Sequence, residues 1–227
     1  MALILNIESS GEICSVCVSR EAEVLSLKES VKPFQHTEQI TLLIDACCKE
    51  AGIKLKDLDA VAISSGPGSY TSLRVGTATA KGICYVLNKP IIAVDTLESL
   101  AGAAIKQIKQ EALYAPMIDA RRMEVYSNIY DHHLQPLEET KALIVTEDTY
   151  SEFKEDVRNI YLLGSGAKKC AELLPPPRFE LMEVDCSALH LVPIAHEKFG
   201  KKDFADLAYF SPFYLKSPNI TKAKPKL

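Results

Sequence analysis

Residues 60–87 have the sequence AVAISSGPGSYTSLRVGTATAKGICYVL. The first five residues are apolar or small, which predicts a short buried strand, and a Gly-Pro-Gly turn follows at 66–68. The remainder predicts a helix over 70–87, with Ser69 placed to cap its first turn. A strand that passes through a glycine turn into a helix is a repeating unit of α/β folds, so we expect the chain to be built from such units.

The rest of the chain repeats this alternation. The predicted order is three strands, helix, strand, helix, strand, helix, and it occurs twice, which indicates an internal duplication. Sequence identity between the halves is negligible, so element order alone carries this interpretation. The predicted strands are 2–7, 13–19, 24–29, 60–64, 90–94, 113–119, 124–130, 138–145, 159–163 and 179–184, and the predicted helices are 37–51, 70–87, 96–110, 148–157, 167–174 and 189–199.

A duplicated unit of this kind predicts the fold class. We expect an α/β protein of two ribonuclease-H-like lobes, each a five-stranded mixed sheet with flanking helices. The predicted boundaries are 1–108 for the N-terminal lobe, 109–216 for the C-terminal lobe, and 217–227 for a flexible lysine-rich tail. Because actin-like ATPases, sugar kinases and nucleases share this architecture, the fold alone does not fix the function.

The composition is that of an ordinary globular protein. Among 227 residues, 26 Lys and Arg stand against 30 Asp and Glu. The resulting net charge of −4 lacks the strongly basic footprint of a dedicated nucleic-acid-binding protein. The sequence shows no export signal and no apolar run of membrane-spanning length, so the seven cysteines predict reduced thiols in a cytoplasmic protein.

The cysteines and histidines do not form a metal-binding pattern. Cys14 and Cys17 lie three residues apart on a predicted strand and therefore face opposite sides of it. His36 lacks a second histidine one helical turn later, where Ile40 stands instead. We expect no bound metal and no cofactor.

Three carboxylates close predicted strands, namely Glu8, Asp95 and Asp119. A ribonuclease-H nuclease binds two magnesium ions through carboxylates clustered in one lobe. Here Glu8 and Asp119 fall in different lobes, and Asp95 is placed to cap the following helix. We therefore disfavour a nuclease and expect no catalytic residue.

Two glycine-containing stretches leave two interpretations open. In the helix over 70–87, Ser72, Gly76 and Ala80 recur every fourth residue. Glycine costs about 1 kcal/mol relative to alanine inside a helix, which indicates that another backbone comes close. That backbone belongs either to the helix over 37–51 or to a partner protein. The LGSGAK stretch at 163–168 is either a plain turn or a place where an adenosine crosses the backbone.

The motif GPGSYTSLRVG at 66–76 carries a family resemblance. Together with ILNIESS near the start, HTEQITLLID at 36–45, DARRMEVY at 119–126, LLGSGAKK at 162–169 and PFYLK at 212–216, it resembles the TsaB (YeaZ) family of bacterial tRNA threonylcarbamoyladenosine biosynthesis proteins. The chain departs from the family pattern where the first strand ends in Glu8-Ser9-Ser10 rather than Asp-Thr-Ser. It also has Ser72 where the family often has glycine, and its C-terminal half matches loosely.

The resemblance implies an actin-like (ASKHA) ATPase fold and a non-catalytic scaffold of the tRNA N6-threonylcarbamoyladenosine modification machinery. The implied partners are a TsaD-type metal-containing transferase, a TsaE-type ATPase and, through the complex, tRNA. Alone, the chain is expected to form a homodimer. The transferase has a His-x-x-x-His metal motif, of which this chain keeps only His36. The alternatives are a stand-alone glycoprotease-like hydrolase or an actin-like ATPase.

The resemblance also implies residue roles, with the docking surface on the first two helices. The partner-interface candidates are Gln39, Leu42, Ala46, Thr71, Ser72, Arg74, Val75, Gly76 and Thr79, and the motif loop comprises Gly66, Pro67, Gly68, Ser69 and Tyr70. The second lobe has Ala-Arg-Arg at 120–122 in place of a glycine-rich phosphate hairpin, so we expect weak or absent nucleotide binding. The corresponding vestigial nucleotide contacts are Ser9, Ser10, Arg121, Arg122, Gly164 and Gly166.

Overall fold

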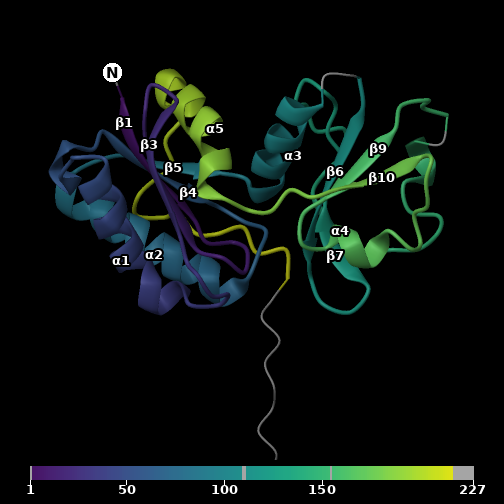
Figure 1. Ribbon diagram of the computed structural model, residues 1–227, viewed down its shortest axis with the longest axis horizontal. Coiled ribbons are helices and arrows are strands. Elements are labelled where there is room, and N and C mark those ends of the chain that lie inside the picture. The colour runs from purple at the N-terminus through teal and green to yellow at the C-terminus, as the bar shows by residue number, and fades with distance from the viewer. Residues whose placement is uncertain (1, 109–110, 154, 217–227) are drawn as a thin grey trace, which may run out of the picture.

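Two lobes of similar architecture lie side by side in the computed structural model, which describes residues 2–108, 111–153 and 155–216 (Figure 1). Each lobe is built on one five-stranded mixed sheet. The first sheet has the strand order β3-β2-β1-β4-β5, and the second has the order β8-β7-β6-β9-β10. The second sheet therefore repeats the first strand for strand, which confirms the predicted duplication and the two-lobed α/β fold.

Most elements begin and end close to the predicted positions. The first half contains β1 (Leu3–Glu8), β2 (Ser15–Arg20), β3 (Glu23–Glu29), α1 (His36–Glu50), the 3₁₀ helix η1 (Leu55–Asp57), β4 (Ala60–Ser64), α2 (Tyr70–Leu87), β5 (Ile91–Val94) and α3 (Thr96–Gln107). The second half contains β6 (Leu113–Asp119), β7 (Glu124–Ser127), β8 (Lys141–Ile144), the 3₁₀ helix η2 (Ser151–Phe153), β9 (Ile160–Leu163), α4 (Ala167–Cys170), β10 (Phe179–Met182) and α5 (Ala188–Lys201). None of the helices in these described ranges combines the length and hydropathy needed to cross a membrane.

The helix predicted over 148–157 is wrong. The described residues of this segment form turns and η2, because Tyr150 adopts a left-handed backbone conformation with φ of 66°, which ends a right-handed helix. The Tyr150 side chain is buried in the core of the second lobe, where its hydroxyl lies 2.7 Å from the Ser127 hydroxyl. Burial of a large aromatic side chain thus overrides the local helical pattern.

Four other elements of the second lobe are shorter than predicted: β7, β8, α4 and β10. Local hydrogen bonds account for two of them. Helix α4 ends at Cys170 rather than at 174, because the Cys170 carbonyl accepts from the backbone N–H groups of both Leu173 and Leu174 and closes a turn. Strand β7 ends at Ser127 rather than at 130, because the Asn128 side-chain oxygen accepts the backbone N–H of Ile129 at 2.7 Å. Such local side-chain hydrogen bonds compete with a strand ladder.

The first sheet is buried on both faces, as its continuous apolar strands β1 and β4 predict. On one face, Leu5 and Ile63 pack against α1 and α2. On the other face, Ile4 and Ile92 pack against α5. Cys14 lies in the core on the α1 side of the sheet, whereas Cys17 packs against Ala188 and Val192 of α5, so the prediction that they face opposite sides is confirmed.

Helices α3 and α5 each pack on the sheet of the other half of the chain (Figure 1). Helix α3 follows β5 of the first sheet but buries Leu97 and Leu100 in the core of the second sheet. Helix α5 follows β10 of the second sheet but buries Leu191 and Ile194 against the first. The lobe boundaries predicted at 1–108 and 109–216 separate the two sheets, but each exchanged helix packs on the sheet across the boundary. That the two ranges are separate folding units stays a prediction.

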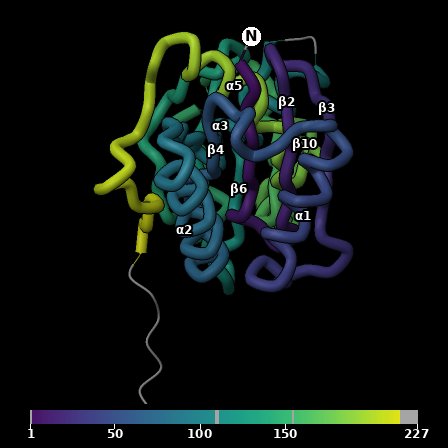
Figure 2. Tube along the Cα trace, turned by 90° about the vertical axis from the view of Figure 1, so that its left-hand side faces the viewer, coloured from purple at the N-terminus to yellow at the C-terminus, as the bar shows by residue number. Residues whose placement is uncertain are grey.

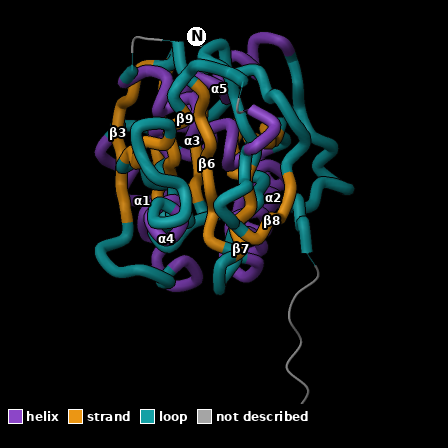
Figure 3. The backbone as a smooth tube through the Cα atoms, turned by 90° about the vertical axis from the view of Figure 1, so that its right-hand side faces the viewer, coloured by secondary structure: helices purple, strands orange, loops and turns teal. Residues whose placement is uncertain are grey.

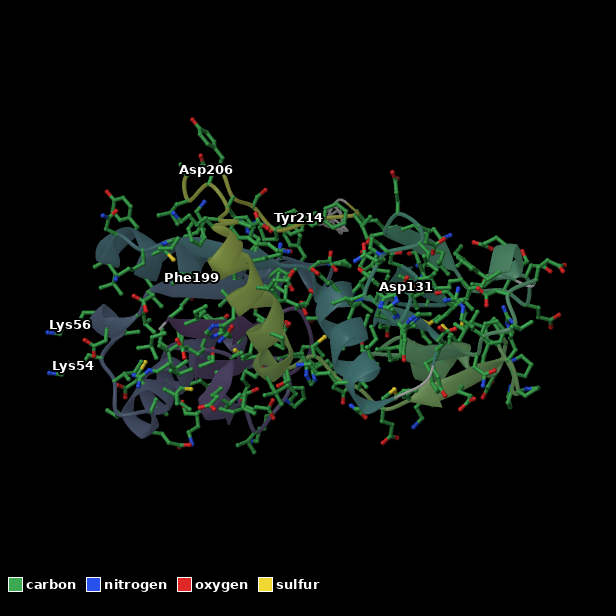
Figure 4. The ribbon with its side chains drawn as sticks, turned by 90° about the horizontal axis from the view of Figure 1, so that it is seen from above. Lys54, Lys56, Asp131, Phe199, Asp206 and Tyr214 are labelled. Carbon is green, nitrogen blue, oxygen red and sulfur yellow. The ribbon has the colours of Figure 1, made fainter. Side chains whose placement is uncertain are left out.

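A loop of the second lobe fills the space between these exchanged helices. Leu134 contacts both the core beneath α3 and the core beneath α5, and its side chain lies 3.5 Å from the position of a Cβ atom on Gly102. Asp131, labelled in Figure 4, shapes the loop by accepting the backbone N–H groups of His133 and Gln135 at 2.8 and 2.9 Å. The lobes are therefore joined by packing as well as by two chain crossings.

The exchange of α5 predicts that this helix stabilises the first lobe. Leu191 is fully buried, so Leu191→Ala should lower the free energy of unfolding by about 2–5 kcal/mol in urea denaturation. The control Leu189→Ala, at an exposed position of the same helix, should cost less than about 1 kcal/mol. Equal losses from the two variants would contradict the packing of α5 on the first sheet.

Candidate functional site

The motif loop Gly66–Tyr70 joins three segments that are distant in the sequence. It follows β4 and leads into α2, and its Ser69 backbone N–H donates to the Ser10 carbonyl of the β1–β2 turn at 2.8 Å. On its other side, the backbone N–H of Phe213 donates to the Ser65 carbonyl at 2.7 Å. Phe213 belongs to residues 203–216, which we name the C-terminal segment.

Gly68 and Gly76 allow the β1–β2 turn to lie directly on the start of α2. A Cβ atom on Gly68 would lie 2.6 Å from the Ser10 carbonyl oxygen, and one on Gly76 would lie 2.1 Å from Ser9 Oγ. Both separations are far below van der Waals contact, so a larger residue would force the turn away from the helix. The close neighbour of Gly76 is therefore the Ser9 side chain of the chain's own β1–β2 turn, and not the backbone of another helix as the sequence predicted.

Gly66 allows the C-terminal segment to lie close to the motif loop. Its φ of 101° lies in the region that favours glycine, and a Cβ atom there would lie 2.8 Å from the Phe213 carbonyl oxygen. The Lys81 ammonium of α2 donates to the Ala208 and Phe210 carbonyls at 3.1 and 2.9 Å. The C-terminal segment is thus fastened along α2.

Two aromatic rings complete this contact. The Tyr70 and Tyr214 ring centroids lie 4.7 Å apart, and the Arg74 guanidinium lies 5.5 Å from the Tyr70 centroid.

Ser69 occupies the N-cap position of α2, but its hydroxyl accepts from the Ser72 hydroxyl at 2.9 Å rather than from a backbone N–H. The predicted side-chain cap is therefore wrong, and the Ser10 carbonyl orders this end of the helix instead.

Glu8, at the end of β1, is a fully buried carboxyl group. Its Oε1 accepts from the backbone N–H and the hydroxyl of Ser10, both at 2.6 Å, while Oε2 has no hydrogen-bond partner among the described residues. Burial raises the pKa of Glu8 above its ordinary value, and the hydrogen bonds from Ser10 oppose this shift. Burial, followed by the nearby Glu8, likewise raises the pKa of the Cys186 thiol, which lies 3.6 Å from the Ser10 hydroxyl.

The predicted nucleotide contacts do not come together in one site. Those in the first lobe pack on α2, and the two glycines of the second lobe pack against β6. Ser9 and Ser10 are buried in the turn that lies on α2. Gly164 and Gly166 bring the β9–α4 turn against β6, where a Cβ atom on Gly164 would lie 2.7 Å from the Met117 carbonyl oxygen. Weak or absent nucleotide binding stays a prediction, and internal packing already accounts for these four residues.

Arg121 and Arg122 form the tip of the β6–β7 hairpin and are both exposed. Their φ angles of 72° and 54° are left-handed, which is costly for residues with side chains. Asp119 accepts the Arg121 backbone N–H at 2.7 Å, and Lys169 donates to the Arg122 and Glu124 carbonyls at 2.6 and 2.7 Å. Lys169 also pairs with Asp119, so the tip is held by several contacts.

The three strand-end carboxylates have separate roles. Asp95 caps α3 by accepting the backbone N–H groups of Leu97 and Glu98 at 2.8 and 3.0 Å, as predicted. Asp119 pairs with Lys169 in the second lobe, and Glu8 hydrogen-bonds to Ser10 in the first.

His36, the first residue of α1, is buried, and its Nε2 has no hydrogen-bond partner in the described part of the chain. Burial lowers the pKa of His36, which favours the neutral ring. Ile40, one turn later, packs in the core of the first lobe. The position that would complete a His-x-x-x-His pair therefore supplies apolar packing.

Helices α1 and α2 both lie on the side of the first lobe that faces the viewer in Figure 2, and they pack against each other. Side chains of both helices line an apolar groove of about 480 Å³. Its lining residues are Thr41, Ile44, Asp45, Cys48, Lys49, Ile53, Lys54, Leu55, Thr79 and Ile83. The nine predicted interface residues divide by exposure: Leu42, Thr71 and Arg74 are exposed, Gln39, Ala46, Val75 and Thr79 are half-buried, and Ser72 and Gly76 are buried.

The sequence prediction missed the groove residues of α1. The side of α1 that faces α2 bears Thr41 and Cys48, whereas the predicted stripe of Gln39 and Ala46 lies on the other side of Leu42. On α2, a helical projection would have found an outer stripe of small and apolar residues at spacings of four and three, because this repeat keeps one face of a helix. That stripe comprises Thr71, Val75, Ala78, Gly82 and Val86.

Comparison with known proteins connects this geometry to a family. The family model for TsaD, described as tRNA N6-adenosine threonylcarbamoyltransferase, matches residues 30–223. The chain is 27% identical to the tRNA threonylcarbamoyladenosine biosynthesis protein TsaB of Escherichia coli (strain K12) over 228 residues, covering 98% of each chain. It is 32% identical to TsaB of Buchnera aphidicola subsp. Schizaphis graminum over 170 residues, which covers 74% of this chain and 80% of the relative.

A solved structure has the same fold as this chain. A Pseudomonas aeruginosa protein described as similar to the peptidase YeaZ superposes with a TM-score of 0.84 at 24% identity, covering 95% of this chain and all of that one. The actin-like ATPase fold expected from the sequence is thereby confirmed.

The contact between Gly76 and Ser9 makes a stability prediction. Gly76→Ala should lower the free energy of unfolding by about 1–3 kcal/mol, because its Cβ has no space beside Ser9. Ser9→Gly in the same chain removes the clashing atoms and should restore most of the loss. Gly82→Ala on the same helix, where the added Cβ meets nothing within 4 Å, should instead stabilise by up to about 1 kcal/mol. Equal effects at both glycines in thermal unfolding would contradict the close contact.

The buried Glu8 predicts a pH dependence of stability. A carboxyl group with a raised folded-state pKa stabilises the fold below its unfolded pKa, near 4.5, and loses this contribution as pH rises through the folded value. Glu8→Gln should therefore flatten the fall of the unfolding free energy as pH rises above about 4.5. Chemical denaturation across this pH range measures the slope. The exposed control Glu147→Gln should leave it unchanged, and an unchanged slope in Glu8→Gln would refute the assignment.

Proposed function

The chain belongs to the TsaB (YeaZ) family, whose curated members are named tRNA threonylcarbamoyladenosine biosynthesis proteins, and from this we propose that it is a non-catalytic scaffold subunit of the tRNA N6-threonylcarbamoyladenosine modification machinery. It binds a TsaD-type transferase, and the assembled pair engages a TsaE-type ATPase and tRNA. One observation carries this proposal: α1 and α2 together present a groove and an outer helical stripe.

The groove supports docking of a partner helix. Its walls come from two adjacent helices, and its floor is apolar, with Ile44 and Ile83 among the lining residues. Beside it, α2 exposes Ala78 and Val86, and α1 exposes Leu42 to 60%. Small and apolar residues on paired helices allow another helix to approach closely, and a helix laid in a groove is a common recognition mode.

The site residues support a role without catalysis. Ile40 occupies the place of a second metal-binding histidine, and the buried Glu8 is hydrogen-bonded by Ser10. The β1–β2 turn that carries Ser9 is packed against Gly76. The contacts of these groups are internal to the first lobe. The surface of α1 and α2 is therefore the feature of this lobe that supports an interaction.

The second candidate is the transferase itself, because the matching family model describes that enzyme. Stoichiometric metal in the purified protein, or threonylcarbamoyl transfer to tRNA by this chain alone, would favour it. The scaffold function requires that transfer depends on both this chain and a TsaD-type partner. In the absence of the partner, we expect the same helix surface to pair two copies of the chain.

The docking surface makes a direct prediction. Leu42→Arg and Ala78→Arg place a charge on the exposed faces of α1 and α2 and should weaken the complex with a TsaD-type partner at least tenfold, or about 1.4 kcal/mol. Isothermal titration calorimetry measures the affinity, and sizing chromatography of the chain alone reports the homodimer. Both variants change exposed positions and should keep the melting temperature.

Val157→Arg is the matched control, because Val157 is an apolar residue of the second lobe that is 95% exposed. It should leave the partner affinity unchanged. The proposed docking surface is wrong if Leu42→Arg and Ala78→Arg bind as tightly as Val157→Arg.

A further inference from the structure

Six basic side chains follow one continuous line of contacts from α2 to the second lobe. They are Arg74, Arg121, Arg122, Lys168, Lys169 and Lys216. The carboxylates along this line are Asp119 and Glu124, and each is already paired with a lysine. The line is thus basic in a chain whose net charge is −4.

The contacts that make this line continuous are specific. Arg74 lies over Tyr70, and Tyr70 stacks with Tyr214 of the C-terminal segment. Two residues later, Lys216 pairs with Glu124 at the start of β7. Figure 1 shows the C-terminal segment, in yellow, reaching the side of the second lobe on which β7 and α4 lie. We name this line from Arg74 to Lys168 the basic ridge.

The β6–β7 hairpin presents its arginines outward at a cost. Arg121 and Arg122 are consecutive left-handed residues, a conformation that costs roughly 1–2 kcal/mol per residue. Lys169 and Asp119 hold the tip in this conformation through backbone hydrogen bonds. Strained backbone that the surroundings maintain is typical of functional positions, and here it displays two exposed guanidinium groups side by side.

We propose that the basic ridge binds an RNA strand directly, with its exposed cations Arg74, Arg121, Arg122 and Lys168 on phosphates and the exposed ring of Tyr214 available to stack on a base. An extended row of Arg and Lys matches a linear polyanion, and aromatic side chains beside such a row bind bases through their faces. The inference rests on the proposed function, in which the RNA is the tRNA. It gives this chain its own part in holding the substrate, in contrast to the expectation that tRNA is held through the partner.

The test measures binding of fluorescently labelled tRNA to the full chain, alone and with a TsaD-type partner, over a salt series from about 50 to 200 mM. The double variant Arg121→Ala/Arg122→Ala should bind about tenfold more weakly at low salt. It should also lower the slope of log affinity against log salt by about 1 for each phosphate that the variant no longer neutralises. Tyr214→Leu should weaken binding at least about fivefold while keeping the salt slope, because stacking releases no counterions.

The charge-matched control is Lys56→Ala/Lys201→Ala, which removes two exposed lysines outside the basic ridge. Figure 4 shows Lys56 at the end of the first lobe that is far from Tyr214. This control should bind tRNA as the wild type does. Equal losses in the arginine and lysine variants, or no binding of tRNA by the wild-type chain at low salt, would overturn the proposal.

Two further measurements separate the possible causes of a negative result. Polyglutamate at the same charge concentration should not displace the tRNA; full displacement would mean that the basic ridge takes an acidic protein segment and would overturn the RNA assignment. Arg121→Ala/Arg122→Ala should still form the complex with the TsaD-type partner at unchanged affinity. Loss of tRNA binding with an intact complex supports the basic ridge, whereas failure of the wild-type complex counts against the proposed function.

Discussion

The contact between the β1–β2 turn and the first turns of α2 is the constraint on which the first lobe depends. Gly68 and Gly76 leave no space for a side chain, and Ser9 and Ser10 occupy that space. The buried Glu8 accepts hydrogen bonds from Ser10 of the same turn, and the Ser10 carbonyl accepts the Ser69 backbone N–H at the start of α2. The groove beside α1 exists in its observed form because α2 is held at this position. A motif that looks like a ligand-binding loop is thus a packing junction.

Local patterns in the sequence were sufficient for much of this architecture. Strand β4 and helix α2 appear at the predicted residues because their apolar runs, turn glycines and helical spacing all agree. The exchange of α3 and α5 could not be predicted, since either sheet can bury an apolar helix of that length and only the tertiary path decides between them. The helix predicted around Tyr150 was wrong for a similar reason, because the core that buries the Tyr150 ring is formed by strands distant in the sequence.

The sequence predicted that α2 has a face of small residues in close contact, but it did not predict which residues make that contact. The recurrence of Ser72, Gly76 and Ala80 indicated a close neighbour, but the neighbour of Gly76 is the Ser9 side chain and not the backbone that was predicted. The outer stripe, which runs through the half-buried Val75 and the exposed Ala78, lies on a neighbouring face of the same helix. Helix α2 therefore has an inner face that packs on its own turn and an outer face that belongs to the proposed docking surface. In the second lobe, whose strands β6 and β7 are labelled in Figure 3, Arg121 lies in the turn between these two strands and therefore on neither face of α2.

Hydrogen exchange of this chain, free and mixed with a TsaD-type partner, tests the central claim most directly. If α1 and α2 form the docking surface, exchange should slow at the backbone amides of residues 37–55 and 70–87, which cover both helices and the rim of the groove. The amides of β6–β10 should exchange at the same rate with and without the partner. Slowing confined to the second lobe, with both helices unchanged, would contradict the account.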